Sequence, residues 1–456
     1  MGGTPVLEML DRVRGEVVTP QSPEYDEARR VYNGMIDRRP LAVVRAVDVA
    51  DVRIAVTAAA ETGFDVAVRA GGHSVPGFGT VDDGIVIDLR GMTGIRIDPR
   101  ARVARVQAGC TWGDLDHAAS SFGLATTGGI ISTTGVSGLT LGGGIGYLAR
   151  AHGLSCDNLR SADVVLADGT FVTASEDDHP DLFWALRGGG GNFGVVTSME
   201  FDLHPVDMIY GGPMFFELDA AEEILRTYRE WIADAPREMG AFPAFQIAPP
   251  LPFIPEDRHG EPFVLLVSCF NGPDDVGAKL LRAFRDIAEP VAEHVDRMPY
   301  AGLNSAFDGL LPPGLQHYWK ANFVEELTDA AIAAHVEHGP RVPALQSTMH
   351  LYPIDGAVHD VAPDATAFAY RHARFAPVIA GMWSDPASNT ANIAWVRDYH
   401  DATAPHSEEG GYVNFMSGDD QDRIRANYGA NYDRLVEIKR RYDPDNVFHL
   451  NQNIRP

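Results

Sequence analysis

The sequence predicts an α+β fold with two domains, and three observations support this prediction. The chain has 456 residues, 45% of them hydrophobic and 22% charged, which is enough apolar material for more than one core. Short strand-like runs alternate with helical runs through the first two hundred residues. After Pro205 the pattern of strand-like and helical runs changes, and we place a domain boundary near residue 207.

The elements of the first part follow from periodicity, caps and turn signals. Asp168-Gly169 is the strongest short hairpin signal in the chain, and a cluster of glycines precedes the last strand. In chain order we expect an extended segment at Leu41–Arg45, a helix at Asp48–Thr62 behind an aspartate cap, strands at Val66–Arg69, Gly84–Leu89 and Arg102–Gln107, a hairpin within Asp163–Ala174, a helix at Asp181–Arg187, the glycines of Gly188–Gly194 and a strand at Val195–Phe201.

The second part is predicted to contain an antiparallel sheet backed by helices. Its expected strands include Met214–Leu218, Phe263–Phe270 and Tyr318–Val324, and its expected helices include Ala220–Ala233 and Ala278–Ala288. The tail from Gln421 to Arg441 has the pattern of one amphipathic helix, which ends at the turn Asp443-Pro444-Asp445.

Charge and cysteine content exclude several classes of function. The 63 acidic and 37 basic residues give a formal charge of −26, which repels a phosphate backbone and argues against nucleic-acid binding. Charged residues interrupt Met1–Val17, so we expect no secretory signal, and no run is long enough to span a membrane. Three scattered cysteines make neither a disulfide framework nor a metal site, which favours a cytoplasmic location.

Three partial matches to known catalytic motifs lack a required residue, spacing or order of elements. Gly189-x-Gly191-x-x-Gly194 follows a helix and precedes a strand, the reverse of a dinucleotide fingerprint. Gly135-Val-Ser-Gly-Leu139 lacks the last glycine of a hydrolase nucleophile elbow. His335 and His338 lack the spacing of a zinc protease.

Two segments remain unusual. Arg69-Ala-Gly-Gly-His-Ser74 directly follows a strand, where glycines let the backbone approach a ligand and successive N–H groups can bind an anion. Gly142-Gly-Gly-Ile-Gly146 is followed by Gly153-Leu-Ser-Cys-Asp-Asn158. Taken alone, His73 either contacts a ligand or caps its loop, and Cys156 is either reactive or a small buried hydrophobic residue.

Together these segments resemble the FAD-binding (PCMH-type) domain of the vanillyl-alcohol-oxidase superfamily, in its berberine-bridge-enzyme-like branch. The resemblance extends from about Pro40 to Pro205 and resumes in Tyr412-Val-Asn-Phe415 and in Tyr442–Ile454. It implies a discontinuous FAD domain at residues 1–207 and 408–456, with a substrate domain at 208–407 and the flavin between them.

The resemblance also implies a bicovalent flavin. His73 would bond to the flavin 8α-methyl carbon and Cys156 to ring carbon 6, which would make the flavin a stronger oxidant and allow an open substrate groove. The residues that it assigns to the cofactor are Arg69, Ala70, Gly71, Gly72, His73, Ser74, Gly135, Thr140, Gly142, Gly143, Gly144, Gly146, Gly153, Cys156, Asp157, Val196, Tyr412, Asn414 and Asn451.

The catalytic base is left open. In several relatives it is the second aromatic residue of a Tyr-x-Asn-Tyr segment, and this chain has Phe415 there, which cannot accept a proton. Either another group serves, or the substrate is a neutral amine that needs no base. The candidates are Tyr412, Tyr147, Tyr318, Lys320 and Tyr370. Tyr318 and Lys320 lie on one expected strand, and Tyr370 lies in Asp364–Arg371, which resembles a family strand.

The function implied is that of an FAD-linked oxidase. It would move a hydride from a C–O or C–N bond of a saccharide, alcohol or secondary metabolite to the flavin, and molecular oxygen would reoxidise the flavin to give hydrogen peroxide. The alternatives are an oxidative cyclase that forms a C–C bond, a dehydrogenase that does not use oxygen, and a non-catalytic FAD-fold binding protein. The substrate and the oligomeric state do not follow from the sequence.

Overall fold

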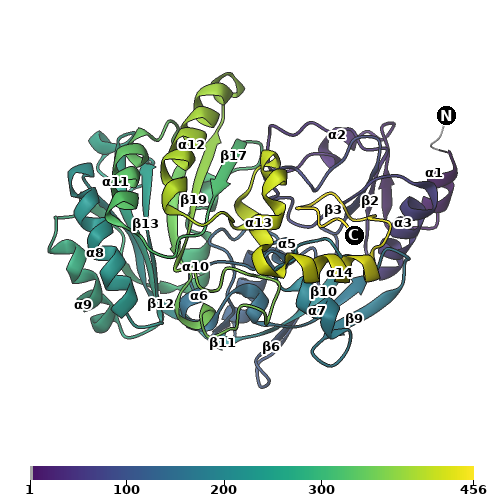
Figure 1. Ribbon diagram of the computed structural model, residues 1–456, viewed down its shortest axis with the longest axis horizontal. Helices are drawn as coiled ribbons and strands as arrows, with labels where there is room; N and C mark the ends of the chain where they lie inside the picture. Colours follow the sequence, from purple (N-terminus) through teal and green to yellow (C-terminus); the bar gives the residue numbers. More distant parts are fainter. Residues whose placement is uncertain (1–3) are drawn as a thin grey trace.

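The computed structural model describes residues 4–456, so residues 1–3 of the Met1–Val17 stretch lie outside the described residues. The described chain forms four β-sheets with helices around them, which confirms the predicted α+β class. Figure 1 shows a large sheet with its helices on one side and the smaller sheets on the other, with the C-terminal segment running back to the smaller sheets.

A four-stranded sheet, of order β1-β2-β4-β3, lies near the N-terminus. Strands β2, β4 and β3 are parallel, and helix α3 (Val49–Thr62) connects β2 to β3. The Asp48 carboxylate accepts hydrogen bonds from two N–H groups at the start of α3, a cap worth about 1 kcal/mol. The strands are β1 (Glu16–Val18), β2 (Ala42–Arg45), β3 (Val66–Arg69) and β4 (Ile85–Asp88).

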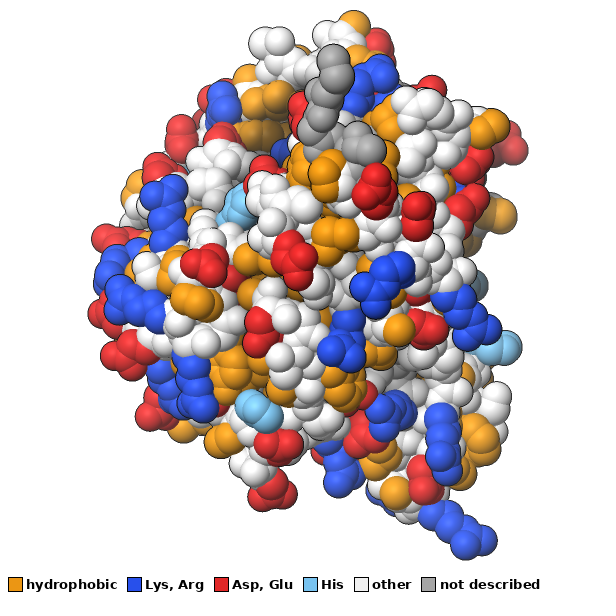
Figure 2. All heavy atoms as spheres, turned by 90° about the vertical axis from the view of Figure 1, so that its right-hand side faces the viewer, with side chains coloured by type: hydrophobic (Ala, Val, Ile, Leu, Met, Phe, Trp, Pro, Cys, Tyr) orange, Lys and Arg blue, Asp and Glu red, His pale blue; other side chains and the backbone are white. Residues whose placement is uncertain are grey.

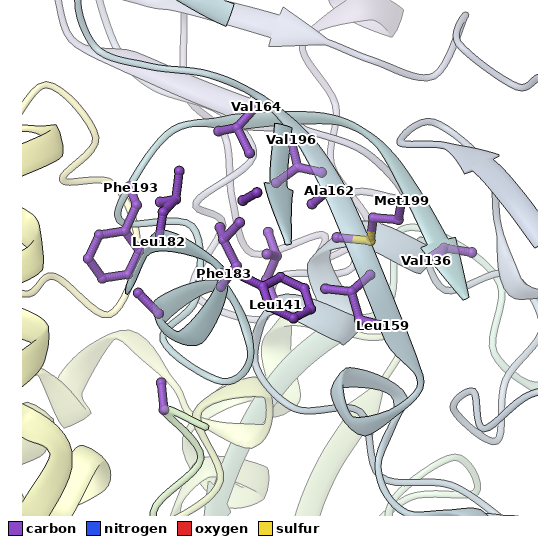
Figure 3. Close-up of a cluster of buried hydrophobic side chains, with 14 of the residues drawn as sticks. Val136, Leu141, Leu159, Ala162, Val164, Leu182, Phe183, Phe193, Val196 and Met199 are labelled. Carbon is purple, nitrogen blue, oxygen red and sulfur yellow. The ribbon is translucent and has the colours of Figure 1, made fainter. Parts of the chain in front are cut away.

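A five-stranded antiparallel sheet of order β5-β6-β10-β8-β9 follows. Helices α5 (Val136–Leu141) and α7 (Pro180–Leu186) contribute side chains to the core on this sheet, and Figure 3 shows Leu141 and Phe183 beside Val196 there. The strands are β5 (Ile95–Asp98), β6 (Val103–Gln107), β8 (Leu159–Val165), β9 (Phe171–Ser175) and β10 (Val195–Asp202).

The largest sheet has eight antiparallel strands, ordered β15-β12-β14-β13-β18-β19-β17, with β16 paired to β12. All of them lie between Met208 and Trp383. One face packs against α8, α9, α11 and α12, and the other face turns toward the smaller sheets. The strands are β12 (Met208–Phe216), β13 (Met239–Ile247), β14 (Pro262–Phe270), β15 (Ala292–Glu293), β16 (Asp296–Pro299), β17 (Gln316–Ala321), β18 (Thr348–Pro353) and β19 (Phe375–Trp383).

The remaining elements are short or lie outside the sheets. The helices that cover the large sheet are α8 (Ala221–Asp234), α9 (Asp274–Arg285), α11 (Asp329–His338) and α12 (Asn389–Thr403). The others are α1 (Thr4–Leu10), α2 (Tyr25–Ala28), α4 (Trp112–Ser120), α6 (Ala149–His152), α10 (Tyr300–Ser305), α13 (Ile424–Tyr428) and α14 (Tyr432–Tyr442), with a two-stranded sheet of β7 (Leu124–Ala125) and β11 (His204–Pro205).

Two predicted elements differ in the structure. The tail is not one helix: α13 and α14 are separated at Gly429, whose positive φ of 50° breaks the helical geometry. Asp364–Arg371 is irregular instead of a strand, because it wraps the end of α7, where Trp184 Nε1 donates to Asp364 O at 2.7 Å. The strand predicted at Met214–Leu218 begins earlier, as β12 at Met208, and the other predicted strands and helices are confirmed to within a few residues at their ends.

The C-terminal segment is fixed by a buried ion pair. Lys439 Nζ lies 2.6 Å from Asp443 Oδ2, and both side chains are 0% exposed. Lys439 also donates to the carbonyls of Asn192 and Phe448, which ties α14 to the Gly188–Gly194 loop. The last residues of the chain are thereby held beside the smaller sheets (Figure 1).

Charged side chains of both signs lie on the surface. Figure 2 shows acidic and basic side chains interspersed over the end of the molecule that carries α1.

Within residues 4–456, no helix has both the length and the apolar character needed to cross a membrane. The three cysteines are unpaired and buried.

Candidate functional site

A cavity of about 380 Å³ lies between the loops of the smaller sheets and the open face of the large sheet. Its lining includes the loop after β3, the Gly188–Gly194 loop, the start of α5, the C-terminal tail and residues of β13, β14, β17, β18 and β19. Residues from both halves of the chain therefore line one cavity.

The loop Ala70–Ser74 forms one wall. Among residues 4–456, no carbonyl or side chain accepts a hydrogen bond from the N–H groups of Gly71, Gly72, His73 and Ser74. A side chain at Gly71 would place its Cβ 2.3 Å from the nitrogen of Gly135, so only glycine allows the two backbones to meet. Free N–H groups in succession, with Gly72 at φ 73°, make a nest that suits a phosphate.

Arg69 lines the same wall, but its charge is already matched. It donates to Asp88 at 2.7 Å and to the carbonyls of Ala28 and Arg30, and its side chain is 1% exposed. Its guanidinium therefore anchors the base of the loop, and the N–H groups above it are the available donors.

His73 projects into the cavity from this loop. Its ring stacks on Tyr32 with 3.8 Å between centroids, and the hydroxyls of Thr133 and Thr134 lie 3.3 Å and 3.5 Å from Nε2 and Nδ1. Burial lowers the pKa of His73 to about 4, against a smaller opposing effect of a hydrogen bond with Thr133. The imidazole is therefore neutral at physiological pH and keeps a nucleophilic lone pair.

The far end of the cavity is an apolar slot closed by the C-terminal tail. Asn451 Nδ2 donates to Gly191 O at 3.2 Å and to Phe448 O at 3.0 Å. Its Oδ1 is buried without a partner among residues 4–456, so it offers an acceptor to a ligand N–H group. The apolar residues of this slot are Val66, Val68, Leu89, Val196, Phe448 and Leu450.

The open face of the large sheet and the C-terminal segment together supply an aromatic wall, which we define as Phe242, Trp319, His350 and Tyr352 of the sheet and Phe415 of the segment. The Phe242 ring lies 4.7 Å from Tyr352 and 4.9 Å from His350, and Phe415 lies 5.7 Å from Tyr352 and 6.1 Å from Trp319. Such rings suit an organic substrate with a flat or apolar surface.

The structure removes Tyr318 and Lys320 from the candidate bases. Neighbouring residues of a strand point to opposite faces, and Trp319 is the residue of β17 that lines the cavity. Tyr318 donates to Asp419 at 2.6 Å on the helix side. Lys320 binds Asp420 and Asp419; burial disfavours its charge, but these carboxylates outweigh burial and raise its pKa.

Tyr147 and Tyr370 also lie outside the cavity lining. The Tyr147 hydroxyl is buried without a partner among the described residues, and burial raises its pKa. Tyr370 donates to Ala426 O at 2.6 Å, and its ring stacks on Phe323. Both side chains pack outside the cavity, so the geometry does not favour the predicted role of either as a base.

Tyr412 is a structural support rather than a lining residue. Its hydroxyl accepts hydrogen bonds from the N–H of Gly144 and from Asn414 Nδ2, both at 2.7 Å, and burial raises its pKa. Asn414 does line the cavity. Tyr412 therefore positions Asn414, and its bound hydroxyl is poorly placed to act as a base.

The second glycine segment packs closely against other parts of the chain. A Cβ at Gly146 would lie 1.8 Å from Gly128 O, and one at Gly142 would lie 2.2 Å from Asn414 Oδ1. The carbonyls of Gly143 and Gly144 accept hydrogen bonds from Cys156 and Ser155. Predicted cofactor residues that do not line the cavity are Thr140, Gly142, Gly143, Gly144, Gly146, Gly153, Cys156, Asp157 and Tyr412.

Cys156 in particular lies behind this segment. It is 0% exposed, and burial and the neighbouring Asp157 raise the pKa of its thiol. Asp157 itself is held by Arg371 in a buried ion pair of 2.6 Å. Of the two predicted tether residues, the structure brings only His73 to the cavity.

His350 and Tyr352 are site residues that the sequence reasoning missed. In Thr348-Met-His-Leu-Tyr352 the polar residues alternate with Met349 and Leu351, which face the helices. This period of two is the signal that identifies a strand with a polar inner row. The segment has few β-branched residues, which weakens that signal.

Replacing Tyr412 by phenylalanine is expected to lower the free energy of unfolding by about 1–3 kcal/mol, because the buried N–H of Gly144 loses its acceptor. Urea unfolding of the flavin-loaded protein measures this change. Tyr432→Phe is the matched control, because the Tyr432 hydroxyl has no partner among residues 4–456, and its effect is expected within about 0.5 kcal/mol. Equal effects for the two variants would contradict the supporting role.

Comparison with known proteins places these features in a family context. Residues 40–175 match the family described as FAD binding domain, and residues 411–455 match the family described as berberine and berberine like. An uncharacterized FAD-linked oxidoreductase of Bacillus subtilis, YgaK, is 31% identical over 98% of each chain. The (R)-6-hydroxynicotine oxidase of Paenarthrobacter nicotinovorans is 31% identical over 97% of each chain. The crystal structure of 6-hydroxy-D-nicotine oxidase from Arthrobacter nicotinovorans superposes with a TM-score of 0.86 at 26% identity, over 99% of each chain.

Proposed function

Because this chain belongs to the berberine-bridge-enzyme-like FAD-linked oxidoreductases, we propose that it tethers FAD at His73 and oxidises a C–O or C–N bond of a small molecule, with oxygen as electron acceptor. The observation that carries this proposal is the single cavity that joins the His73 loop to the aromatic wall. FAD-linked oxidoreduction is the activity of the family, whereas the acceptor, the substrate and the tether belong to the proposal.

The cavity residues fit the parts of FAD. The free N–H groups of Gly71–Ser74 suit the pyrophosphate, and the apolar slot with Val196 suits the adenine. The unpartnered Asn451 Oδ1 suits an N–H donor of the cofactor. When bound, the flavin supplies a two-electron acceptor for a hydride. The chain's own contribution is to orient the rings and to exclude water with the aromatic wall.

We propose one covalent tether instead of two. A neutral imidazole at the cavity surface, as at His73, has the lone pair that a bond to the flavin methyl carbon requires. A thiol must be deprotonated to react, and Cys156 is sealed from the cavity with a raised pKa. None of the three cysteines lines the cavity within the described chain, so no second tether is proposed.

The test is anaerobic mixing of the purified protein with a panel of alcohols, amines and saccharides while the flavin absorbance is recorded. We expect the oxidised-flavin bands to bleach with at least one class and to return when oxygen is admitted, with hydrogen peroxide released in proportion. A preparation without flavin would support a non-catalytic binding protein and contradict the proposal. Bleaching without return in oxygen would identify a dehydrogenase, and a product of unchanged oxygen content with a new ring would identify a cyclase.

A further inference from the structure

Two histidines on the cavity side of the large sheet have a ring nitrogen without a partner among residues 4–456: His317 of β17, which packs against Tyr32 outside the cavity lining, and His350, which lines the cavity. His350 lies on β18 between Ala244 of β13 and Val378 of β19, and small neighbours leave its ring open to the cavity. Its Nδ1 is 2.5 Å from the Tyr352 hydroxyl. Its Nε2 has no partner among residues 4–456 and is not among the polar atoms sealed from solvent, so it faces the cavity space.

The Tyr352 hydroxyl fixes the orientation of this ring. Tyr352 lies two residues further along β18 on the same face, and Phe242 packs against both rings. In the tautomer in which the Nδ1–H group donates to the Tyr352 oxygen, Nε2 keeps a free lone pair and presents it to the cavity. Burial lowers the pKa of His350 to about 3, which keeps the ring neutral.

The rest of the wall is uncharged. Among the residues that line the cavity, the one charged side chain within the described chain is Arg69, which is paired with Asp88 far from β18. Around His350 the apolar side chains Val267, Val378 and Met382 lie beside the aromatic wall, together with the polar but uncharged Gln246, Gln346 and Thr348. A charged substrate would lose its hydration there without a counter-ion, whereas the aromatic wall suits a neutral substrate with a flat apolar part.

We propose that Nε2 of His350, oriented by Tyr352, accepts the hydroxyl proton of a neutral, apolar alcohol such as an aryl carbinol. This inference rests on the proposed function and names its base and substrate class. His350 is then a catalytic residue and Tyr352 a positioning residue. Phe415 has no hydroxyl to serve as a base, and His350 of the same aromatic wall supplies the proton acceptor instead.

The atoms and electrons of the step balance as follows. The C–H bond breaks and its hydrogen leaves with both electrons to the bound flavin, while the O–H bond breaks and its proton goes to Nε2. A C=O bond forms, so the alcohol loses two electrons and the flavin gains two, which oxygen later removes. As the hydride departs, the substrate becomes a protonated carbonyl, which is acidic enough to protonate a weakly basic imidazole.

The experiment compares His350→Ala, Tyr352→Phe and the control Tyr318→Phe, which removes a tyrosine hydroxyl on the opposite face of the same sheet. Anaerobic flavin reduction by 1-phenylethanol is measured, together with the dissociation constant of acetophenone from the oxidised protein. We expect His350→Ala to slow reduction about 100-fold or more, and free imidazole to restore part of the rate. Acetophenone affinity is expected to change less than about threefold, because the product carries no proton to transfer.

For Tyr352→Phe we expect a loss of about tenfold in the reduction rate with little change in the half-saturating alcohol concentration, and for Tyr318→Phe less than about twofold. A flavin-free protein contradicts the proposed function itself. Flavin that benzylamine or cellobiose reduces but no aryl alcohol does leaves the proposed function standing and overturns this inference. An unchanged rate in His350→Ala, or no rescue by imidazole, overturns it as well.

Discussion

Replacing His73 by alanine is expected to abolish acid-stable flavin, whereas the wild-type chain keeps its yellow colour after precipitation in trichloroacetic acid. The reason is that His73 is the one nucleophilic side chain in the described lining with a neutral ring on the loop whose N–H groups are free. The N–H groups of Gly71–Ser74 do not depend on the side chain, so the variant should still bind FAD reversibly. Absorbance of the pellet and supernatant, with peptide mass mapping, measures the change.

The matched control is Cys156→Ser, which removes the other predicted attachment point. Because Cys156 lies outside the cavity lining, we expect the serine variant to keep its flavin through denaturation. A flavin adduct on the Cys156 peptide of the wild type would contradict the single-tether proposal and restore the two-tether prediction. Acid-stable flavin in His73→Ala would show that another residue forms the bond.

The loss of the covalent bond to His73 should also make the flavin a weaker oxidant. Alkylation of the flavin methyl group draws electron density from the ring, so flavin without the His73 bond is expected to have a lower reduction potential. Substrate oxidation by reconstituted His73→Ala should then be slower at equal flavin content. A potential equal to that of the wild type would separate the role of His73 in retention from any role in the chemistry.

The loop that carries His73 was predictable because its signal is local. A strand, two glycines and a histidine follow one another in Val66–Ser74, and each of these features constrains the backbone at that point. The glycines of Gly142–Gly146 give an equally strong local signal, but glycine reports only that something approaches closely. Whether the neighbour is a phosphate or the carbonyl of Gly128 depends on tertiary packing.

Which side chains of the substrate-domain strands point into the cavity was not predictable, for a related reason. In Tyr318-Trp-Lys320 all three side chains are long and partly apolar, so no alternation marks the cavity face. The pairing of Trp319 with Ala380 in β19 decides it, and that register is a contact between distant parts of the chain. The same register places His350 and Tyr352 on the inner face, where no local motif announces them.

Replacing Asp443 by alanine is expected to lower the free energy of unfolding by about 3–5 kcal/mol, because it leaves the fully buried ammonium of Lys439 without its counter-ion. Two backbone N–H groups, of Val447 and Phe448, lose their acceptor at the same time. The segment that they fix carries Asn451 into the cavity, so flavin retention should fall as well. Urea unfolding and flavin content per chain measure both effects.

A surface pair on the same C-terminal segment provides the control. Asp433 lies 2.9 Å from Arg425, but their side chains are 77% and 67% exposed, so Asp433→Ala should cost only about 0–1 kcal/mol. Adding Lys439→Met to Asp443→Ala should recover part of the lost stability, because methionine removes the uncompensated charge and fills the same space. If the single Asp443 variant costs as little as Asp433→Ala, the buried pair does not hold the tail. If the double variant recovers nothing, the cost arises from the N–H groups of the turn, and the ion pair itself contributes little.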